Sequence, residues 1–184
     1  MKNTIQFTGE ITFTAHEQKN PIARAFNEGL ELFYKAGLIS RSTLASYYLK
    51  GKPTRTFKKK NIIATAGLSV LAQILVGDYA STGAITHAAL GTGVGTPAIG
   101  DTTLFNEVYR NDIASSSSFG ATAILIAFYT ESEVDGTFTE FGNFIDGTGV
   151  VDTGQLWSKI TVAWTKSSAE TLTVQQVYEL TNKP

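Results

Sequence analysis

The chain has 184 residues, with 15 Lys and Arg against 16 Asp and Glu, and it contains no cysteine. A hydrophobic content of 42% is enough to build a core, which excludes a wholly disordered chain. Without cysteine, disulfide scaffolds, thiolate zinc sites and cysteine nucleophiles are excluded as well. The two histidines, His16 and His87, stand 71 positions apart and offer little to a histidine-based metal site.

The charges are divided unevenly along the chain. Residues 1–60 carry 11 basic and 4 acidic side chains, a net +7, whereas residues 61–184 carry 4 basic and 12 acidic side chains, a net −8. Such an asymmetry predicts two ends with different partners. The basic side chains are densest over eleven residues: Lys50, Lys52, Arg55, Lys58, Lys59 and Lys60. They suit docking on an acidic protein surface, a solvated linker or contact with a nucleic-acid backbone, and we do not expect nucleic acid as the partner.

The sequence predicts neither a signal peptide nor a membrane span. The N-terminal residues alternate between polar and apolar types and lack a continuous apolar stretch. The longest apolar segment, Ile62–Val76, has 15 residues and includes Thr, Gly, Ser and Gln. A membrane helix needs about 20 residues, so we expect a soluble, non-secreted protein that makes no membrane contact.

The N-terminal part predicts a strand followed by a helix. Residues 3–14 alternate as a strand does, and Gly9 with Glu10 interrupts them as in a short hairpin or a bulge. Asn20 suits an N-cap and Pro21 the first helical position, with Gly37 where a helix ends. The apolar residues of this helix are spaced by four, four and three: Ile22, Phe26, Leu30 and Phe33.

Two further helices are expected before the texture of the chain changes. A short helix over Ser42–Leu49 precedes a polar run, residues 50–61 around Pro53, which predicts a connector. Asn61–Val76 predicts a third helix that ends at Gly77. It is apolar on most faces, so we expect it to be buried between two layers.

The remainder of the chain is typical of β-structure. Segments rich in Thr, Val, Ile and aromatic residues recur at 86–92, 104–114, 120–131, 137–145, 156–165 and 171–180. Ala121–Tyr129 is apolar on both faces, which favours a central strand. We expect an α+β fold that is mainly β. A basic N-terminal attachment segment, residues 1–60, would provide a strand pair plus helices. Residues 61–184 would form a helix and an antiparallel β-sandwich or jelly-roll-like domain.

Two glycine-containing loops are candidate ligand sites. The run LGTGVGTPAIGD, Leu90–Asp101, resembles a phosphate loop only superficially. It has neither the spacing of a dinucleotide fingerprint nor the Lys of a Walker loop, so we expect no nucleotide cofactor and a structural turn instead. Asp146 and Asp152 could contribute to a Ca²⁺ site, but two carboxylates without EF-hand spacing favour an exposed loop and no metal.

Catalysis finds no better support in the sequence. Glu131, Glu133 and Asp135 could act as a glycosidase acid and base, although a solvated turn explains them more simply. Residues 115–118, four serines without a matching His and Asp, predict a flexible loop. We therefore expect a non-enzymatic protein without catalytic residues or cofactor.

Two tryptophans are candidates for a contact surface. Trp157 and Trp164 lie seven residues apart, so on one strand they point to opposite faces. One is expected in the core, and the other could anchor an interface or bind a sugar. We take Trp157 as the candidate interaction residue, with Tyr109 as a second aromatic for a glycan.

A more specific pattern extends over residues 60–180. It begins with NIIATAGLSVLAQILVGD and continues as ALGTGVGTPAIGDTTLFNEVYR, then as GTFTEFGNF and finally as TLTV. The order of these pieces resembles a widespread group of tailed-bacteriophage virion proteins, which occur in tail, baseplate, fibre and neck components. The matching polar and glycine positions include Asn61, Gly67, Asp101, Glu107 and Arg110. The first 60 residues lie outside this resemblance.

The resemblance implies a structural component of the virion, assembled in the host cytoplasm and present in many copies. Its partners would be other virion structural proteins, and a homo-oligomer such as a ring or trimer is expected in the tail, baseplate or neck. Three alternatives stay open: a capsid decoration or head-fibre protein, a module that binds host glycan, and, last, a hydrolase of surface polysaccharide.

Overall fold

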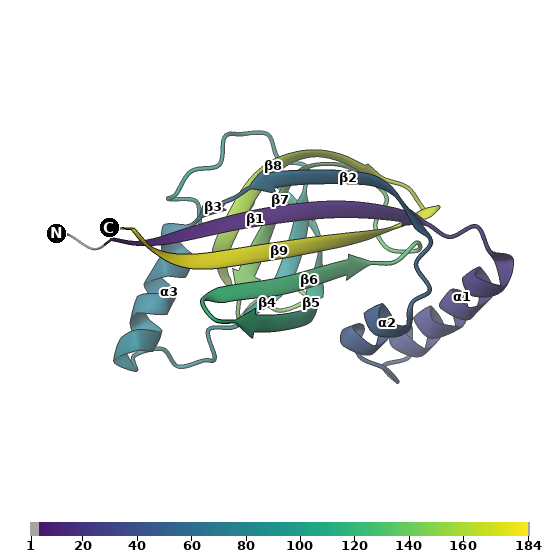
Figure 1. Ribbon diagram of the computed structural model, residues 1–184, viewed down its shortest axis with the longest axis horizontal. Helices are drawn as coiled ribbons and strands as arrows, with labels where there is room; N and C mark the ends of the chain where they lie inside the picture. Colours follow the sequence, from purple (N-terminus) through teal and green to yellow (C-terminus); the bar gives the residue numbers. More distant parts are fainter. Residues whose placement is uncertain (1–3, 184) are drawn as a thin grey trace.

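The computed structural model describes residues 4–183, of which the larger part is β-structure: 49% of the chain is strand and 19% is helix. This confirms the α+β, mainly β class (Figure 1). The strands are β1 (Thr4–Glu17), β2 (Lys52–Lys60), β3 (Ile62–Ile63), β4 (Ile85–Gly91), β5 (Glu107–Phe119), β6 (Thr122–Tyr129), β7 (Gly136–Ile145), β8 (Gln155–Lys166) and β9 (Glu170–Lys183). The helices are α1 (Pro21–Lys35), α2 (Arg41–Tyr47) and α3 (Thr65–Val76).

All the strands of the described chain belong to one antiparallel sheet that nearly closes on itself, in the order β2-β1-β9-β6-β5-β4-β7-β8-β3. The sheet folds over at β5, whose first half pairs with β4 and whose second half pairs with β6. A register shift between Ile113 and Ser115 marks the bend, as a β-bulge commonly does. The expected sandwich thus takes the form of one sheet wrapped over a core, and we call it the barrel.

The core lies between the two leaves of the barrel (Figure 1). Phe13 on β1 contacts Phe141 on β7 and Trp164 on β8, with ring centroids 5.2 and 5.5 Å apart. These side chains are almost fully buried, and their neighbours on β6 and β9 are Ala127, Tyr129, Leu172 and Val174. Burial of this apolar surface is the main force that holds the two leaves together.

The barrel is closed along β2 by side chains. β2 pairs with β1 through backbone hydrogen bonds, while β8 pairs with the two residues of β3. Across the remaining gap, Arg55 Nη2 donates to Thr165 O at 2.6 Å and Lys59 Nζ donates to Thr161 O at 3.0 Å. Between these two cations, Phe57 packs on the ring of Phe13.

The expected connector over residues 50–61 is therefore wrong, because Lys52–Lys60 is a strand. The inward positions of this strand do not read as apolar in the sequence. Arg55, Phe57 and Lys59 face β8 and the core, although two of the three are basic. Long basic side chains can cover apolar surface with their stems and still reach a polar partner.

The boundary near residue 60 does not divide two folded units. β1 pairs with β9 along its whole length, from Thr4 opposite Lys183 to Glu17 opposite Glu170. The first and last strands are therefore central to the same sheet. Only α1 and α2 stand apart, at the end of the barrel away from α3 and from the described chain ends (Figure 1).

The expected α1 is confirmed, while β1 differs from expectation. The side chain of Asn20 accepts from the N–H groups of Ile22 and Ala23 at 2.9 and 3.3 Å, which caps the helix. Gly37 follows the helix with a φ of +72°, a conformation that favours glycine. β1 continues through Gly9 as one strand instead of a hairpin. A side chain at Gly9 would collide with Asn61.

The third helix is shorter and more exposed than expected. Ile62 and Ile63 pair with β8, and α3 begins only at Thr65. Gly67 and Val70 are buried, but Leu75 and Val76 are 80% and 71% exposed, so the expected burial between two layers is wrong. The helix covers an end of the barrel with one face only. No described helix is long and apolar enough to cross a membrane.

The six later segments all contain strands, at bounds close to those expected except for β5, which continues beyond residue 114 to Phe119. Ala121–Tyr129 contains β6, which lies inside the sheet between β9 and β5 as predicted. Ser115–Ser118 is not a loop. These serines belong to β5, and their backbone pairs with Ile126–Ala123 on β6, which overrides the low strand propensity of the run.

Candidate assembly surface

The two N-terminal helices, with the turn between them, form a helical arm, residues 20–48, at one end of the barrel (Figure 1). The chain enters the arm from β1 and leaves it into β2. Leu44 and Tyr48 of the arm are buried against Phe128 of the barrel, and the rings of Tyr48 and Phe128 are 5.2 Å apart. Leu30 and Ile39 of the arm pack against the same cluster, and a polar cluster beside it supplies the directional bonds.

Arg41 is the centre of that polar cluster. Its side chain is 4% exposed, and its two terminal nitrogens bind the two oxygens of Glu133 at 2.6 and 2.8 Å. The guanidinium also donates to Asn111 Oδ1 at 2.8 Å and to the Tyr34 hydroxyl at 2.9 Å. A bidentate, buried pair of this kind fixes orientation as well as distance. The arm therefore has one defined pose on the barrel.

The ionisation of this pair follows from its contacts. Burial alone would raise the pKa of Glu133, but hydrogen bonds and charge from Arg41, with the Thr130 N–H and Asn111, outweigh it and hold that pKa below its ordinary value of 4.5. Burial likewise opposes the charged form of Arg41, yet the bonds to Glu133 raise its pKa. Both groups are charged in the folded protein.

The face of α1 that turns toward the barrel carries two buried polar side chains beside Leu30, which packs on the apolar contact. Asn27 is buried and exchanges hydrogen bonds with the backbone of Leu49, at 2.9 Å to the N–H and 3.1 Å to the carbonyl. Glu31, 7% exposed, accepts from the Tyr48 hydroxyl at 2.8 Å and from the Ser132 hydroxyl. Burial, and then the hydrogen bond to Glu31, raise the pKa of Tyr48 far above its ordinary value.

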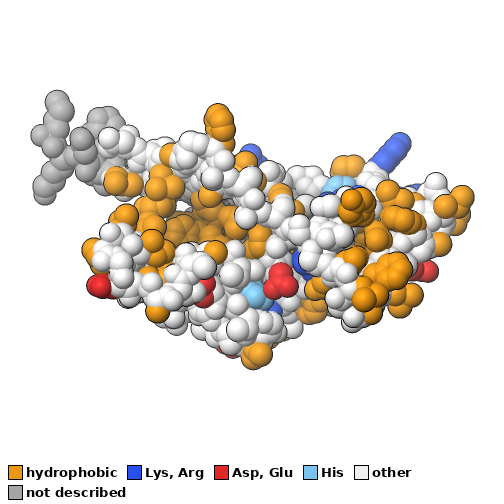
Figure 2. All heavy atoms as spheres, turned by 90° about the horizontal axis from the view of Figure 1, so that it is seen from below, with side chains coloured by type: hydrophobic (Ala, Val, Ile, Leu, Met, Phe, Trp, Pro, Cys, Tyr) orange, Lys and Arg blue, Asp and Glu red, His pale blue; other side chains and the backbone are white. Residues whose placement is uncertain are grey.

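The opposite face of α1 is apolar and lies in solvent. Ile22 and Leu32 are 80% and 68% exposed, and Phe26 and Phe33 about half exposed. Figure 2 shows hydrophobic side chains gathered over the arm, at the right of that view. A surface helix of a globular protein ordinarily turns its apolar stripe toward the core. The orientation of α1 is inverted, because most of its large apolar side chains point away from its own barrel. Contiguous exposed apolar surface of this kind marks an interaction site.

Small residues lie along the middle of this apolar face. Ala25 is exposed, and a Cβ built on Gly29 would meet nothing within 4 Å. A glycine inside a helix costs about 0.5–1 kcal/mol relative to alanine, and contacts within this chain give no reason for it. The space over Gly29 is open to whatever binds α1.

The six predicted basic residues do not form one free patch. Arg55 and Lys59 close the barrel, and Arg55 also pairs with Glu170. Lys58 pairs with Glu10 at 2.7 Å. Lys50 is half-buried, with its Nζ 4.7 Å from the centre of the Phe128 ring, and burial lowers its pKa. Lys52 and Lys60 are left on the surface.

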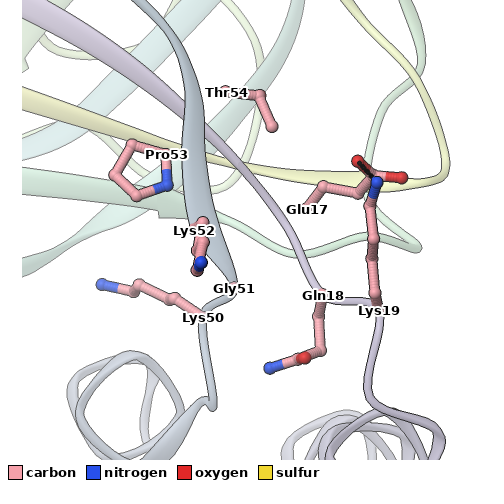
Figure 3. A pocket seen from close by; sticks show the side chains of 8 residues that line it. All are labelled: Glu17, Gln18, Lys19, Lys50, Gly51, Lys52, Pro53 and Thr54. Atoms are coloured by element: carbon pink, nitrogen blue, oxygen red, sulfur yellow. Dashed lines mark ion pairs between the residues drawn. The ribbon is translucent and has the colours of Figure 1, made fainter.

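Lys50 and Lys52 also line an open groove of about 790 Å³ where the arm meets the barrel (Figure 3). The opposite wall holds Glu17, Gln18 and Lys19, with Glu17 and Lys19 paired at 3.3 Å. The lining carries both signs of charge and no nucleophile beside a base. We find no arrangement for catalysis in it.

The tryptophan expected at an interface is buried. Trp157 is 8% exposed and lies beneath α3, where a Cβ on Gly67 would come within 2.7 Å of its ring. Trp164 is 4% exposed in the barrel core. The prediction that Trp157 is exposed and binds a sugar or anchors an interface is therefore wrong. Tyr109 is half-buried and packs on Tyr129, so neither aromatic supports glycan binding.

The glycine-rich loop is held by a buried carboxylate that sequence reasoning missed. Glu140, fully buried on β7, accepts from the backbone N–H groups of Gly93, Phe105 and Asn106 at 2.7–3.0 Å. Lys159 lies 3.4 Å from Glu140 and 3.3 Å from Asp101. These N–H groups are occupied by the protein itself, as the predicted structural turn requires. A lone Glu in the apolar strand TFTEFGNF was the available signal.

The acidic loop is organised in a similar way. Arg110 binds Glu107 at 2.5 and 2.7 Å and donates to the carbonyls of Thr148 and Thr153 at 3.0 Å. Asp146 accepts from the Tyr79 hydroxyl at 2.7 Å. Within residues 4–183 there is no group of three His, Asp or Glu side chains that could hold a metal ion.

The three acidic residues considered for glycosidase chemistry have other contacts. Glu133 is engaged by Arg41, and Asp135 pairs with Lys166 at 3.7 Å. Burial raises the pKa of Glu131, partly offset by Arg24 at 3.8 Å. The prediction of a solvated turn is also wrong for Glu133, which anchors the arm.

Comparison with known proteins found no matching family model, curated protein or solved structure.

Proposed function

We propose that this protein is a non-enzymatic structural component of a tailed bacteriophage particle, attached to its neighbours through the helical arm. The exposed apolar face of α1 carries the proposal, because a helix that buries Asn27 and Glu31 while exposing Phe26 and Phe33 is built to bind a protein surface. The resemblance of residues 60–180 to virion proteins is the reason for proposing that the assembly is a phage particle.

The arm suits attachment for a second reason. Arg41 and Glu133 fix its pose on the barrel, so binding at α1 places the whole molecule in a defined orientation. A component of a tail, baseplate or neck requires such an orientation because its contacts repeat around a symmetric assembly. A capsid decoration or head-fibre protein would use the same arm at another place on the particle.

Immunogold labelling of intact particles tests the proposal. Antibody against the protein should label tail, baseplate or neck; label on the head would assign it as a decoration or head-fibre protein. Particles without label, in a preparation that expresses the protein, would refute a structural role in the virion.

A substitution in α1 tests whether the protein is incorporated into particles through the arm. Phe33→Glu places a charge in the apolar face and should reduce incorporation into particles at least tenfold. Val94→Glu is the matched control, since Val94 is 91% exposed in a loop far along the chain from the arm. Normal incorporation of the Phe33→Glu variant would show that the arm is not the attachment surface.

A further inference from the structure

We infer that the apolar face of α1 binds the same face of a second copy, with the two helices antiparallel about a two-fold axis. The inference rests on the proposed function, since it names the partner of the assembly surface. The crossing point is the pair Ala25 and Gly29, which lie one helical turn apart in the middle of the face.

Size complementarity favours a second copy. When Ala25 of one helix lies opposite Gly29 of the other, the smallest side chains meet and the backbones can approach closely, into the open space over Gly29. The same register places Ile22 opposite Leu32 of the other copy. Each of these large exposed side chains then gains an apolar partner at either end of the contact.

Charge complementarity favours the same register. Arg24 and Glu28 follow one edge of the face, and the antiparallel arrangement brings Arg24 within about 3 Å, along the helix axis, of Glu28 in the other copy. The two-fold axis makes this pair twice. Glu28 has no ion pair among the described residues, and Arg24 is half exposed, 3.8 Å from Glu131.

The area of the contact sets its strength. A helix of 15 residues is about 22 Å long, and a contact along it falls short of the roughly 800 Å² per partner of a stable complex. The pair is therefore weak in dilute solution. It becomes populated where copies are held close together, as in an assembled particle.

Cysteine cross-linking of the full chain tests the pairing, and the natural chain offers no competing thiol. Ala25→Cys and Gly29→Cys proteins are prepared separately, mixed at high concentration and oxidised with copper–phenanthroline. A mixed disulfide should form at least tenfold faster than in Ala25→Cys alone, because only the antiparallel register brings these two positions together. Leu75→Cys, exposed at the end of α3, is the control partner.

A non-cysteine variant separates contact from folding. The same register pairs Ile22→Cys with Leu32→Cys, which should also form a mixed disulfide. Gly29→Leu in both of these backgrounds fills the close approach at the crossing point, and it should abolish that disulfide. Leucine has the higher helix propensity, so unfolding of α1 would not account for the loss.

Each other outcome overturns the inference. Faster linking of Ala25→Cys to itself indicates parallel helices. Preferential linking to Leu75→Cys indicates a head-to-tail contact between the arm and α3. A rate no higher than the control, with particles that still carry the protein, rejects the second copy and leaves the proposed function intact.

Discussion

The barrel and the helical arm are stabilised by different kinds of interaction. The barrel core is a set of aromatic and aliphatic side chains, such as Phe13 and Trp164, packed between two leaves of a sheet. The arm shares a smaller apolar cluster with the barrel and adds buried polar groups to it, with Arg41 and Glu133 at the centre. Apolar packing tolerates small rotations, whereas a bidentate ion pair specifies one orientation.

The difference explains the inversion of α1. Asn27, Glu31 and Arg41 occupy much of the barrel side of the arm, and Leu30 is the one large aliphatic residue of α1 that packs there. The other large apolar side chains of α1 stay in solvent: Ile22, Phe26, Leu32 and Phe33. The arm thus combines a largely polar contact with its own barrel and an exposed apolar face, which is the face proposed for attachment.

The largest expected effect is in the barrel. Phe13→Ala removes a fully buried ring from the core and should cost about 3–5 kcal/mol of unfolding free energy. Denaturant unfolding followed by tryptophan fluorescence measures it as one cooperative transition. Phe119→Ala, at a ring 87% exposed, should change the stability by no more than about 0.5 kcal/mol. Equal effects of the two would contradict the assignment of the core.

The next effect should separate the arm from the barrel. Arg41→Ala leaves Glu133 buried without its partner, which costs about 3–5 kcal/mol and releases the arm. Hydrogen exchange should rise throughout α1 and α2 and little in β6 and β9. In contrast, Arg24→Ala should cost less than about 1 kcal/mol, because Arg24 is half exposed and its single contact with Glu131 is long, at 3.8 Å. Equal loss of protection in the barrel strands would mean that the arm is not a separable unit.

Acidification should weaken the docking of the arm on the barrel, because protonation of Glu133 removes its ion pair with Arg41. The pKa of Glu133 is lower in the folded protein than its ordinary 4.5, so its stabilising contribution is complete above pH 4.5 and is lost as the pH falls through the folded value. The slope for one group is at most about 1.4 kcal/mol per pH unit. Proteolysis of the arm, followed between about pH 6 and pH 3, measures the loss.

Glu133→Gln serves as the control for this pH dependence. The raised pKa of Glu131 acts in the opposite direction, since acidification relieves its buried charge. Both proteins contain Glu131, so the difference between their profiles belongs to Glu133. Identical profiles would show that another group governs the acid response of the arm.

The smallest effect concerns the start of α1. Asn20→Ala removes the cap on the N–H groups of Ile22 and Ala23 and should cost about 1 kcal/mol of arm stability. Exchange rates of the first-turn amides measure it. Asn20→Asp restores a capping oxygen and should recover most of the loss; an equally large effect of Asp would exclude capping as the cause.

Much of the fold could be predicted from the sequence where the signal is local. The cap at Asn20, the glycine after α1 and the strand segments after residue 85, apart from the serine half of β5, depend on neighbouring residues and match the predicted bounds closely. β2 was missed because its inward positions include Arg55 and Lys59, whose partners lie on β8. Such pairing is set by the closed sheet and has no local pattern.

The candidate surface shows the same limit. The spacing of Ile22, Phe26, Leu30 and Phe33 predicts an apolar side of the helix but not the direction in which it points. That direction depends on Arg41 meeting Glu133, 92 residues later. The seven-residue spacing of Trp157 and Trp164 places them on opposite faces of β8 but does not show that α3 covers the outer face, where Gly67 lies against Trp157.

The pairing of β1 with β9 has a consequence for how the chain folds. β1 is synthesised early, yet the partner on one of its edges, β9, is synthesised after every other strand. The leaf that contains β1 and β9 cannot form until β9 has been synthesised, so its closure follows the synthesis of the other described strands. Sheets dominated by such long-range pairs fold on the order of milliseconds to seconds. The arm needs Asn111 and Glu133 from the middle of the chain, so its docking can precede that closure.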